Sequence, residues 1–238
     1  SFVSHHSESP EAMHERLMTE AGRTTPAAKV FDRLLPRVRA IAMNAGRAGA
    51  NVLLRDAAIG EIRAVLGADP DERTLTHVVR QYCLPVADRV FRHQTLEWAS
   101  TIAQRRGWRF NLHGRGWDSH PSFRAFARGE LPHDESLRAA YQSAAVSLQT
   151  TINTPVHQRV MECAMSGGLP ICRLTHDSIT VLASDMYKAA VVESQPAASW
   201  RTRRDFPCYV IADSPGAMMR LAQLQRLGEP CPEPMPGW

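Results

Sequence analysis

The residues best suited to chemistry in this chain stand close together between residues 154 and 162. Thr154 followed by Pro155 predicts a helix start, because threonine caps helix N-termini and proline fits the first helical position. The free N–H groups of such a start attract anions, and a guanidinium such as that of Arg159 adds a charge-assisted hydrogen bond. The expected first turns therefore predict a diphosphate site made of Thr154, His157, Gln158 and Arg159.

Glu162 follows Arg159 by three residues, on a neighbouring part of the same helix face. A carboxylate one turn beyond a phosphate site repels phosphate, but it accepts hydrogen bonds from the two hydroxyls of a ribose. The order of arginine and glutamate therefore matches a nucleoside diphosphate whose phosphates lie nearer the helix tip. The alternative is an ordinary solvated ion pair that contributes little to stability. The spacing alone leaves both interpretations open.

Two groups of glycines flank this region. Gly114-Arg115-Gly116 ends a predicted strand and resembles the glycine turn of dinucleotide sites, although the third glycine and an immediate helix are missing. Gly167 and Gly168 precede another predicted strand, where glycines usually end a helix. Both groups are candidate ligand contacts, and the alternative for both is a plain turn or cap.

The elements that must position these residues follow from Trp108 onward, where short apolar runs alternate with segments of helical periodicity. The predicted strands are 108–113, 146–149, 169–172 and 208–212, and the predicted helices are 136–145, 154–166 and 215–227. Helices between short buried strands predict a parallel sheet. Ligands of such sheets bind beyond the carboxyl ends of the strands, which is where the helix of Arg159 is expected to begin.

The stretch from Pro10 to Arg106 predicts mostly helices, because apolar residues recur there at helical spacing. Gly67 suits the C-terminal cap of one helix, and Asp69 followed by Pro70 suits the start of the next. We interpret this junction as a linker between helices.

The bulk composition indicates a folded and mildly basic protein. The 238 residues are 44% hydrophobic and carry a formal net charge of +4, which permits anionic ligands without indicating nucleic acid. The five cysteines lack C-x-x-C or zinc-ligand spacing and favour a reducing, cytoplasmic setting. No apolar run is long enough to span a bilayer, and the first residues lack a signal-peptide pattern. Since residue 1 is not methionine, we expect a processed chain or a part of a longer one.

Three motifs, in order, resemble the C-terminal domain of GT-B glycosyltransferases, in particular the CgeB-like and group-one families. They are residues 113–117 (HGRGW), the helix from Leu137 to Ala144, and the run from His157 to Pro170. The family pattern is G-x-G after a strand, L-x-x-x-Y-x-x-A in a helix, and R-x-x-E-x-x-x-x-G before a strand. The resemblance extends to Ser1-Phe2-Val3 as the first strand of that domain and leaves Gly22 to His93 as an insertion.

Residue by residue, the resemblance implies that Glu162 holds the ribose hydroxyls, and that Arg159 with the start of its helix holds the diphosphate. It also implies that residues 114–116 let the backbone approach the donor. The retaining group-one pattern has a second glutamate seven residues before Glu162, where this sequence has Pro155, so contacts to the donor sugar and the stereochemical outcome stay open. Tyr141 of the second motif is expected to pack in the core.

Other motifs have simpler explanations. Asp69-Pro70-Asp71 spells the D-x-D of metal-dependent glycosyltransferases, but that motif belongs at a strand end and here it joins helices. The basic cluster 201–204 next to Trp200 fits phosphate contacts or a solvated loop. The ten histidines show no metal-ligand spacing, and His113 and His157 stand near the predicted cleft. We expect no metal and no cofactor, since the nucleotide sugar is a substrate.

The sequence thus predicts an α/β fold, a Rossmann-like parallel sheet flanked by helices with a large helical insertion. Residues 1–106 are expected to form the first strand and a mainly helical segment, 107–228 a nucleotide-sugar-binding core, and 229–238 a proline-rich tail. The expected function is donor binding in a metal-independent GT-B glycosyltransferase, in which an N-terminal domain or partner chain supplies the acceptor site. The alternative is a non-catalytic module for binding or assembly. A nucleic-acid-binding protein has only the charge balance behind it.

Overall fold

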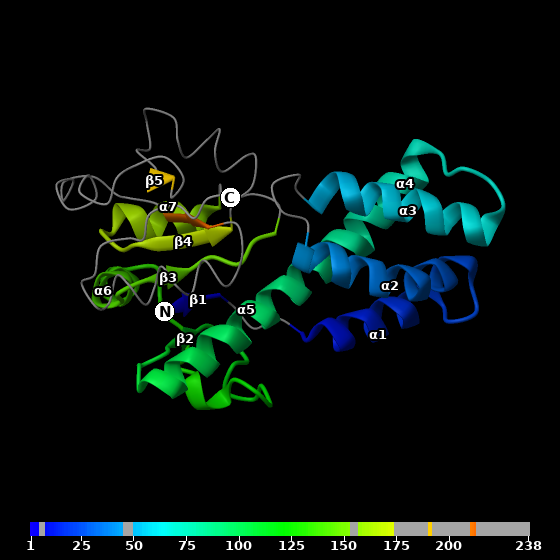
Figure 1. Ribbon diagram of the computed structural model, residues 1–238. Helices are drawn as coiled ribbons and strands as arrows, with labels where there is room; N and C mark the ends of the chain where they lie inside the picture. The colour runs from blue at the N-terminus through cyan, green and yellow to red at the C-terminus, as the bar shows by residue number, and fades with distance from the viewer. Residues whose placement is uncertain (5–7, 45–49, 153–156, 174–189, 192–209, 213–238) are drawn as a thin grey trace. The chain divides into compact units, whose positions relative to one another are not determined.

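The computed structural model describes residues 1–4, 8–44, 50–152, 157–173, 190–191 and 210–212 (Figure 1). The chain divides into two compact units. The sheet unit comprises Ser1–His6 and Thr95–Trp238, and the helical unit comprises Ser7–Gln94. The division falls within the long helix α5 (Leu84–Arg106).

The described strands of the sheet unit are short and pair in parallel. They are β1 (Phe2–Val3), β2 (Leu112–His113), β3 (Ser147–Leu148), β4 (Pro170–Arg173), β5 (Ala190–Val191) and β6 (Val210–Ala212). β1 pairs with β2, and the other four follow the order β3-β4-β6-β5. The parallel pairing of short strands with intervening helices is compatible with the expected α/β class, whereas the full Rossmann-like sheet stays a prediction.

β1 hydrogen-bonds on both of its sides. Toward β2, the Phe2 amide donates to the Asn111 carbonyl at 3.0 Å. Toward β3, the Ser1 amino group donates to Val146 O at 2.6 Å, and the Leu148 amide donates to Ser1 O at 2.8 Å. The start of the chain therefore lies between segments that follow it by more than a hundred residues (Figure 1).

The core of the sheet unit is a cluster of large apolar side chains. Its members include Phe2, Leu96, Phe110, Leu112, Trp117, Phe123 and Leu148. Trp117 is fully buried, and its indole N–H donates to the Ser4 carbonyl at 2.8 Å. Its ring also meets Phe2 edge-on, with the centroids 6.1 Å apart. This side chain therefore fixes the loop after β2 against the end of β1.

Helices α6 (Glu135–Ser143) and α7 (Gln158–Met165) lie within one or two residues of the predicted segments at their C-terminal ends. The predicted strands are confirmed in place, but two of them are shorter than predicted, since 108–113 contributes only β2 and 146–149 only β3. Tyr141 is buried beside Leu137 and Cys163, which confirms its expected place in the core. The predicted helix 215–227, the tail 229–238 and the basic cluster 201–204 lie outside the described residues.

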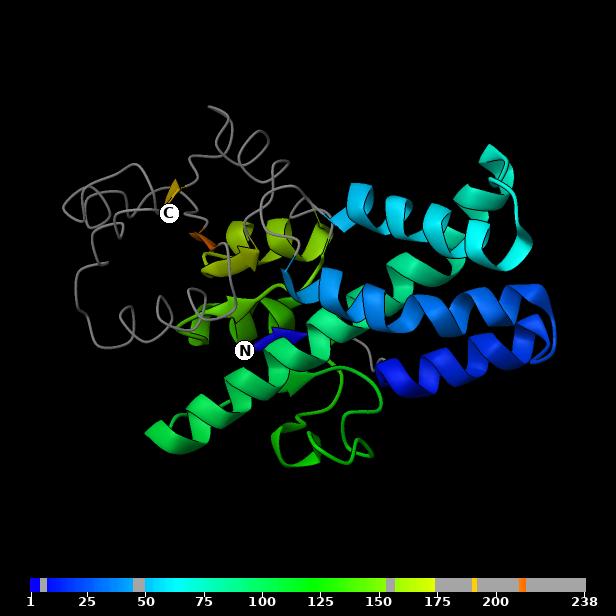
Figure 2. The ribbon, with the colours of Figure 1, turned by 45° about the vertical axis from the view of Figure 1, so that its right-hand side comes forward.

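The helical unit confirms the expected run of helices (Figure 2). It contains α1 (Pro10–Ala21), α2 (Pro26–Asn44), α3 (Ala50–Leu66), α4 (Glu72–Val78), a π-helical turn (Val79–Cys83) and the start of α5. Tyr82 in the π-helical turn stacks on Phe31 with centroids 4.3 Å apart, and its hydroxyl lies 2.7 Å from His14 Nδ1. These contacts join α1, α2 and the π-helical turn in one core.

The junction between α3 and α4 is a linker, with one correction. Gly67 has a φ of +73° and its amide donates to Arg63 O at 2.9 Å, which confirms the expected cap. The expected start at Asp69 was wrong, because Asp71 is the residue that caps α4, accepting from the Thr74 amide at 2.6 Å. Asp69 instead pairs with Arg63. Both carboxylates of the D-x-D sequence are thus engaged locally.

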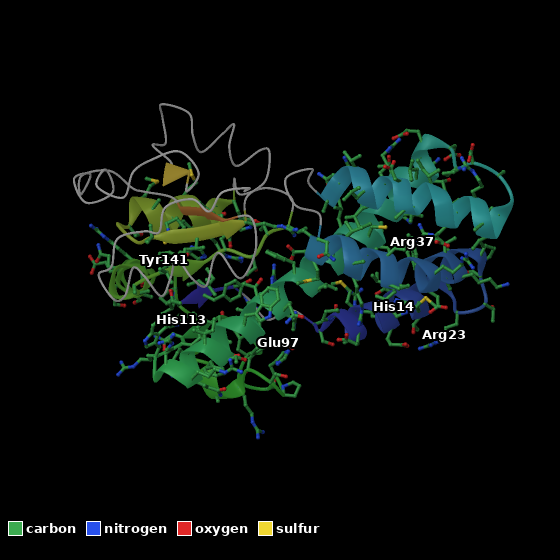
Figure 3. All side chains as sticks on the ribbon, viewed as in Figure 1. His14, Arg23, Arg37, Glu97, His113 and Tyr141 are labelled. Carbon is green, nitrogen blue, oxygen red and sulfur yellow. The ribbon has the colours of Figure 1, made fainter. Side chains whose placement is uncertain are left out.

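Glu61 of α3 is a buried carboxylate shared by two cations of α2. Its side chain is only 5% exposed, and its oxygens lie 2.6 Å from Arg33 Nε and 2.7 Å from Arg37 Nε. Figure 3 shows Arg37 extending from α2. Since a buried charge is costly unless it is paired, this contact fixes α2 against α3.

We predict that Glu61→Ala lowers the free energy of unfolding by about 2 kcal/mol, as expected for charge-assisted hydrogen bonds whose cations stay partly hydrated. Urea denaturation followed by circular dichroism measures the loss. Glu72→Ala is the control, because Glu72 also pairs with an arginine, Arg55, but its side chain is 71% exposed. An equal loss in both variants contradicts the prediction.

Candidate functional site

A pocket of about 170 Å³ lies in the sheet unit. Its wall is formed by the ends of β1 and β2, the chain before α6, the start of α6 and the first turns of α7. Six of its lining residues are His113, Gly114, His157, Gln158, Arg159 and Glu162. The carboxyl ends of two parallel strands thus meet a helix start, which is where open α/β sheets bind ligands.

The pocket brings together five of the predicted site residues, namely Gly114, His157, Gln158, Arg159 and Glu162. Arg115, Gly116, Gly167 and Gly168 do not line this pocket. Thr154 lies outside the described residues. The predicted site is therefore assembled around α7 and the end of β2.

The predicted start of α7 at Thr154-Pro155 was wrong. The helix begins at Gln158, and His157 is its N-cap, with an extended backbone at φ −115° and ψ 143°. The ring nitrogen Nδ1 of His157 accepts from the Arg159 amide at 3.2 Å. One free donor of the first turn is therefore satisfied by the histidine itself, and the ring must hold Nδ1 unprotonated to accept.

Glu162 presents a partly buried carboxylate to the pocket, with its side chain 23% exposed. The Gln158 side-chain amide donates to Glu162 Oε1 at 2.6 Å, and His133 Nδ1 lies 3.6 Å from the same oxygen. Arg159, the predicted partner in an ordinary surface pair, lines the same pocket. The carboxylate thus accepts a hydrogen bond from Gln158, as it would from a ligand hydroxyl.

The G-x-G turn after β2 has the backbone that the sequence suggests. Gly114 and Gly116 have φ values of +134° and +76°, which disfavour other residues. The Gly114 amide donates to Gly129 O at 2.8 Å, which holds the turn against the chain before α6. Arg115 points to Glu130, with Nε 3.1 Å from the carboxylate, and its side chain is 70% exposed. Within this turn, Gly114 is the residue that reaches the pocket.

Gly167 and Gly168 lie at the opposite end of α7 from the pocket wall. Gly167 has a φ of +82° and its amide donates to Ala164 O, as expected for a helix end. A Cβ on Gly168 would stand 2.8 Å from Cys163 Sγ and 3.1 Å from Tyr141 Cβ. Gly168 therefore has a packing function, since α6 and α7 meet there at close range, whereas a Cβ on Gly167 would meet no atom within 4 Å.

Sequence reasoning missed the residues that the end of β1, the chain before α6 and the start of α6 add to the pocket. These are Val3, Ser4, Glu130, Leu131, His133 and Leu137. The parallel pairing of β1 with β2 could have indicated Val3 and Ser4, because neighbouring parallel strands end at the same edge. No sequence pattern marks His133 as a pocket residue. It stands in a loop, and its side chain is 72% exposed.

His113 is the last residue of β2, and burial is the main cause that lowers its pKa below the ordinary histidine value. Its Nδ1 is buried and has no hydrogen-bond partner among the described residues. The ring is therefore neutral near pH 7 and can donate or accept a hydrogen bond at the pocket wall.

Residues 89–188 match the family model described as glycosyl transferase-like. This segment contains β2, α6, β3, α7 and β4 and all of the pocket except Val3 and Ser4. No curated protein and no solved structure matches the chain. The match supports a glycosyltransferase family and a general role in glycosyl transfer. The CgeB-like group and the GT-B donor half stay predictions.

Two further observations concern the described parts of the chain. None of the helices there has the length and apolar character needed to cross a membrane. No group of three or more histidine, cysteine, aspartate or glutamate side chains is arranged to hold a metal ion among those same residues.

We predict that Gly168→Ala lowers the free energy of unfolding by about 1–3 kcal/mol, because the added methyl group meets Cys163 and the Tyr141 backbone. Thermal unfolding measures this loss. Gly60→Ala in α3 is the control with the opposite sign. No atom lies within 4 Å of its added Cβ, and alanine favours the helix by about 0.5–1 kcal/mol. A neutral Gly168→Ala would mean that this contact relaxes freely.

Proposed function

We propose that the sheet unit is the donor-binding half of a GT-B type glycosyltransferase and binds a nucleotide-diphosphate sugar. The observation that carries this proposal is the convergence of His157, Arg159 and Glu162 with Gly114 in one pocket, in a segment that matches a glycosyl transferase-like family. A Rossmann-like sheet is the fold that such a half uses, and the parallel strands agree with it.

The proposed division of roles follows the helix axis. Arg159 and the partial positive charge at the start of α7 hold the diphosphate, because a helix N-terminus and a guanidinium both attract anions. Glu162 lies one turn farther along and accepts hydrogen bonds from the ribose hydroxyls, which replace the Gln158 contact at Oε1. Gly114 lets the donor approach the backbone at the end of β2.

Arg159 and the partial positive charge at the start of α7 accelerate transfer by stabilising the negative charge that develops on the leaving diphosphate. This stabilisation is strongest where the pocket is closed to water. It requires no metal ion. The acceptor site and any general base then come from a second domain or a partner chain. A module that binds donor without transfer is the competing function, and it is an outcome of the following test.

Glu162→Ala is expected to weaken nucleotide-sugar binding by about tenfold to a hundredfold, because two charge-assisted hydrogen bonds to the ribose are lost. Isothermal titration calorimetry with UDP-glucose and GDP-mannose measures the change. Glu135→Ala is the matched control, since Glu135 is an exposed glutamate in the first turn of α6 that does not line the pocket.

The outcomes of this titration separate the parts of the proposal. If the wild-type protein binds none of these nucleotides at millimolar concentration, the whole donor-site proposal is wrong. If wild type and Glu162→Ala bind equally well, only the proposed contact of Glu162 with the ribose is wrong. Binding without hydrolysis or transfer, with the full-length gene product present, favours the non-catalytic module.

The His157 cap allows a second prediction that separates helix stability from anion binding. Asparagine and aspartate both cap helices well, so His157→Asn and His157→Asp are expected to keep the unfolding midpoint near that of wild type. Only His157→Asp adds a negative charge at the proposed diphosphate position, and we expect more than a tenfold loss of affinity for UDP-glucose in that variant alone. Equal affinities of the two variants would place the diphosphate elsewhere.

A further inference from the structure

The chain from residue 105 to residue 128 is strongly basic. It contains six arginines and a single acidic residue, Asp118. Arg115 pairs with Glu130, which follows this segment. The other five arginines are exposed, and none of them forms an ion pair with an acidic side chain of the described residues. They are Arg105, Arg106, Arg109, Arg124 and Arg128.

The arginines of the helical unit have different surroundings. Most of those described there form ion pairs with carboxylates, namely Arg16, Arg23, Arg33, Arg37, Arg39, Arg55, Arg63, Arg89 and Arg92. A group of like charges without such partners repels itself and attracts anions from solution. The five exposed arginines of the sheet unit therefore form a candidate contact surface for an anionic partner.

Three of these arginines stand at the end of α5. Arg105 and Arg106 belong to the last turn of the helix. The Trp108 amide donates to Ala103 O at 2.8 Å, so the chain turns back beside this last turn. Arg109 follows directly, in the chain that leads into β2. The three guanidinium groups are therefore carried by one short segment.

The chain that follows β2 brings the other two arginines to this segment. The Arg128 guanidinium donates to Asn111 Oδ1 at 3.0 Å. The rings of Phe126 and Phe110 have their centroids 5.4 Å apart, and Arg124 begins the 3₁₀ turn that ends at Phe126. Figure 1 and Figure 2 show the end of α5 and the chain after β2 on the same side of β1. We call the surface formed by these five arginines the arginine patch.

Partly exposed apolar side chains border the arginine patch. Trp98 and Ile102 precede Arg106 at intervals of four residues, so the three share one face of α5. Trp108 and Phe126 stand within the two segments that carry the arginines. All four apolar side chains pack against the core of the sheet unit and keep part of their surface exposed. The surface therefore combines positive charge with an apolar border.

We propose that the arginine patch binds the surface of an anionic lipid bilayer, with its apolar border in the interfacial region of that bilayer. Guanidinium groups bind lipid phosphates through charge-assisted hydrogen bonds, while their aliphatic stems and the aromatic rings contact the acyl boundary. Groups of about four to eight basic residues are typical of surfaces that bind anionic lipids. None of the five arginines lines the pocket at α7, so this surface does not depend on the proposed donor site.

The packing of the apolar border favours a bilayer over a nucleic acid. Proteins that bind single strands offer aromatic rings on which the bases stack. Trp108 and Phe126 pack against the core, so only a part of each side chain is exposed. Ile102 has no ring for a base to stack on. Side chains that are apolar and half-buried instead suit the boundary between lipid head groups and acyl chains.

Sedimentation with vesicles tests this proposal on the whole chain. Wild type is expected to bind vesicles of phosphatidylcholine mixed with phosphatidylglycerol and not vesicles of phosphatidylcholine alone, and added salt weakens the binding. Arg105→Gln/Arg106→Gln is expected to bind the anionic vesicles about 10–30-fold more weakly, because each arginine near such a surface contributes about fivefold.

Two further variants complete this test. Arg109→Gln/Arg124→Gln changes the patch outside α5 and is expected to show a similar loss. Arg73→Gln/Arg80→Gln is the matched control, because it removes the same charge from exposed arginines of the helical unit that also form no ion pair with the described residues. We expect this control to bind as wild type does. Unfolding midpoints from circular dichroism show that each variant is folded.

Quenchers carried by the lipid test the apolar border. Anionic vesicles with brominated acyl chains are expected to quench the tryptophan fluorescence of wild type, whereas inorganic phosphate is expected to leave it unchanged. Trp98→Phe/Trp108→Phe keeps the aromatic packing and is expected to lose most of this quenching. Quenching that is unchanged in this variant would mean that another part of the chain meets the bilayer, which contradicts the proposed border.

Three results of the sedimentation overturn the proposal. The first is failure of wild type to bind anionic vesicles at low ionic strength. The second is an equal loss in the patch variants and in the Arg73→Gln/Arg80→Gln control, since net charge alone then explains the binding. The third is a single-stranded oligonucleotide that wild type binds and the patch variants do not, while their vesicle binding is unchanged, because the partner is then a nucleic acid.

Discussion

The hydrogen bonding of β1 to both of its neighbours is the constraint on which the sheet unit depends. Ser1 binds the chain at Val146 and Leu148, and Phe2 binds the chain before β2. Because these pairs are parallel, the strands end at one edge, and residues more than a hundred positions apart form a single pocket wall there. The buried indole of Trp117 holds the next loop to Ser4 at the same edge. This strand arrangement places the ends of β1 and β2 beside the proposed ligand residues of α7, so that together they line one pocket.

The order of the elements could be predicted from the sequence, because apolar periodicity and glycine positions are local signals. Helix starts could not. Asp69 and Asp71 are equally good caps by type, and Thr154 is by type a better cap than His157. Which one is used depends on the backbone that tertiary packing imposes, and in both helices the later residue has the extended conformation of a cap. The shift moves Arg159 and His157 closer to the tip of α7 than the sequence suggested.

The candidate site divides in a similar way. Arg159, Glu162 and Gly114 could be singled out because their types and spacing match a recognisable pattern, and they do line one pocket. His133 and Leu131 could not be predicted as pocket residues. The chain before α6 is held in place by single backbone hydrogen bonds, such as that from Gly114 N to Gly129 O, and local composition does not predict such bonds. Gly168 shows the converse. Its glycine is explained by close packing against Tyr141 and Cys163, which looks the same in a sequence as a ligand turn does.

The helical unit is inserted between two strands that are direct neighbours, since Ser7–Gln94 separates β1 from β2. A parallel crossover needs only about a dozen residues, and the part of α5 from Thr95 to Arg106 is already of that length. The inserted residues are thus topologically dispensable for strand pairing. Evolution can therefore add, enlarge or delete the inserted helices without changing the order of the strands. The sequence of the helical unit is then free to change at a different rate from the sequence of the segments that line the pocket.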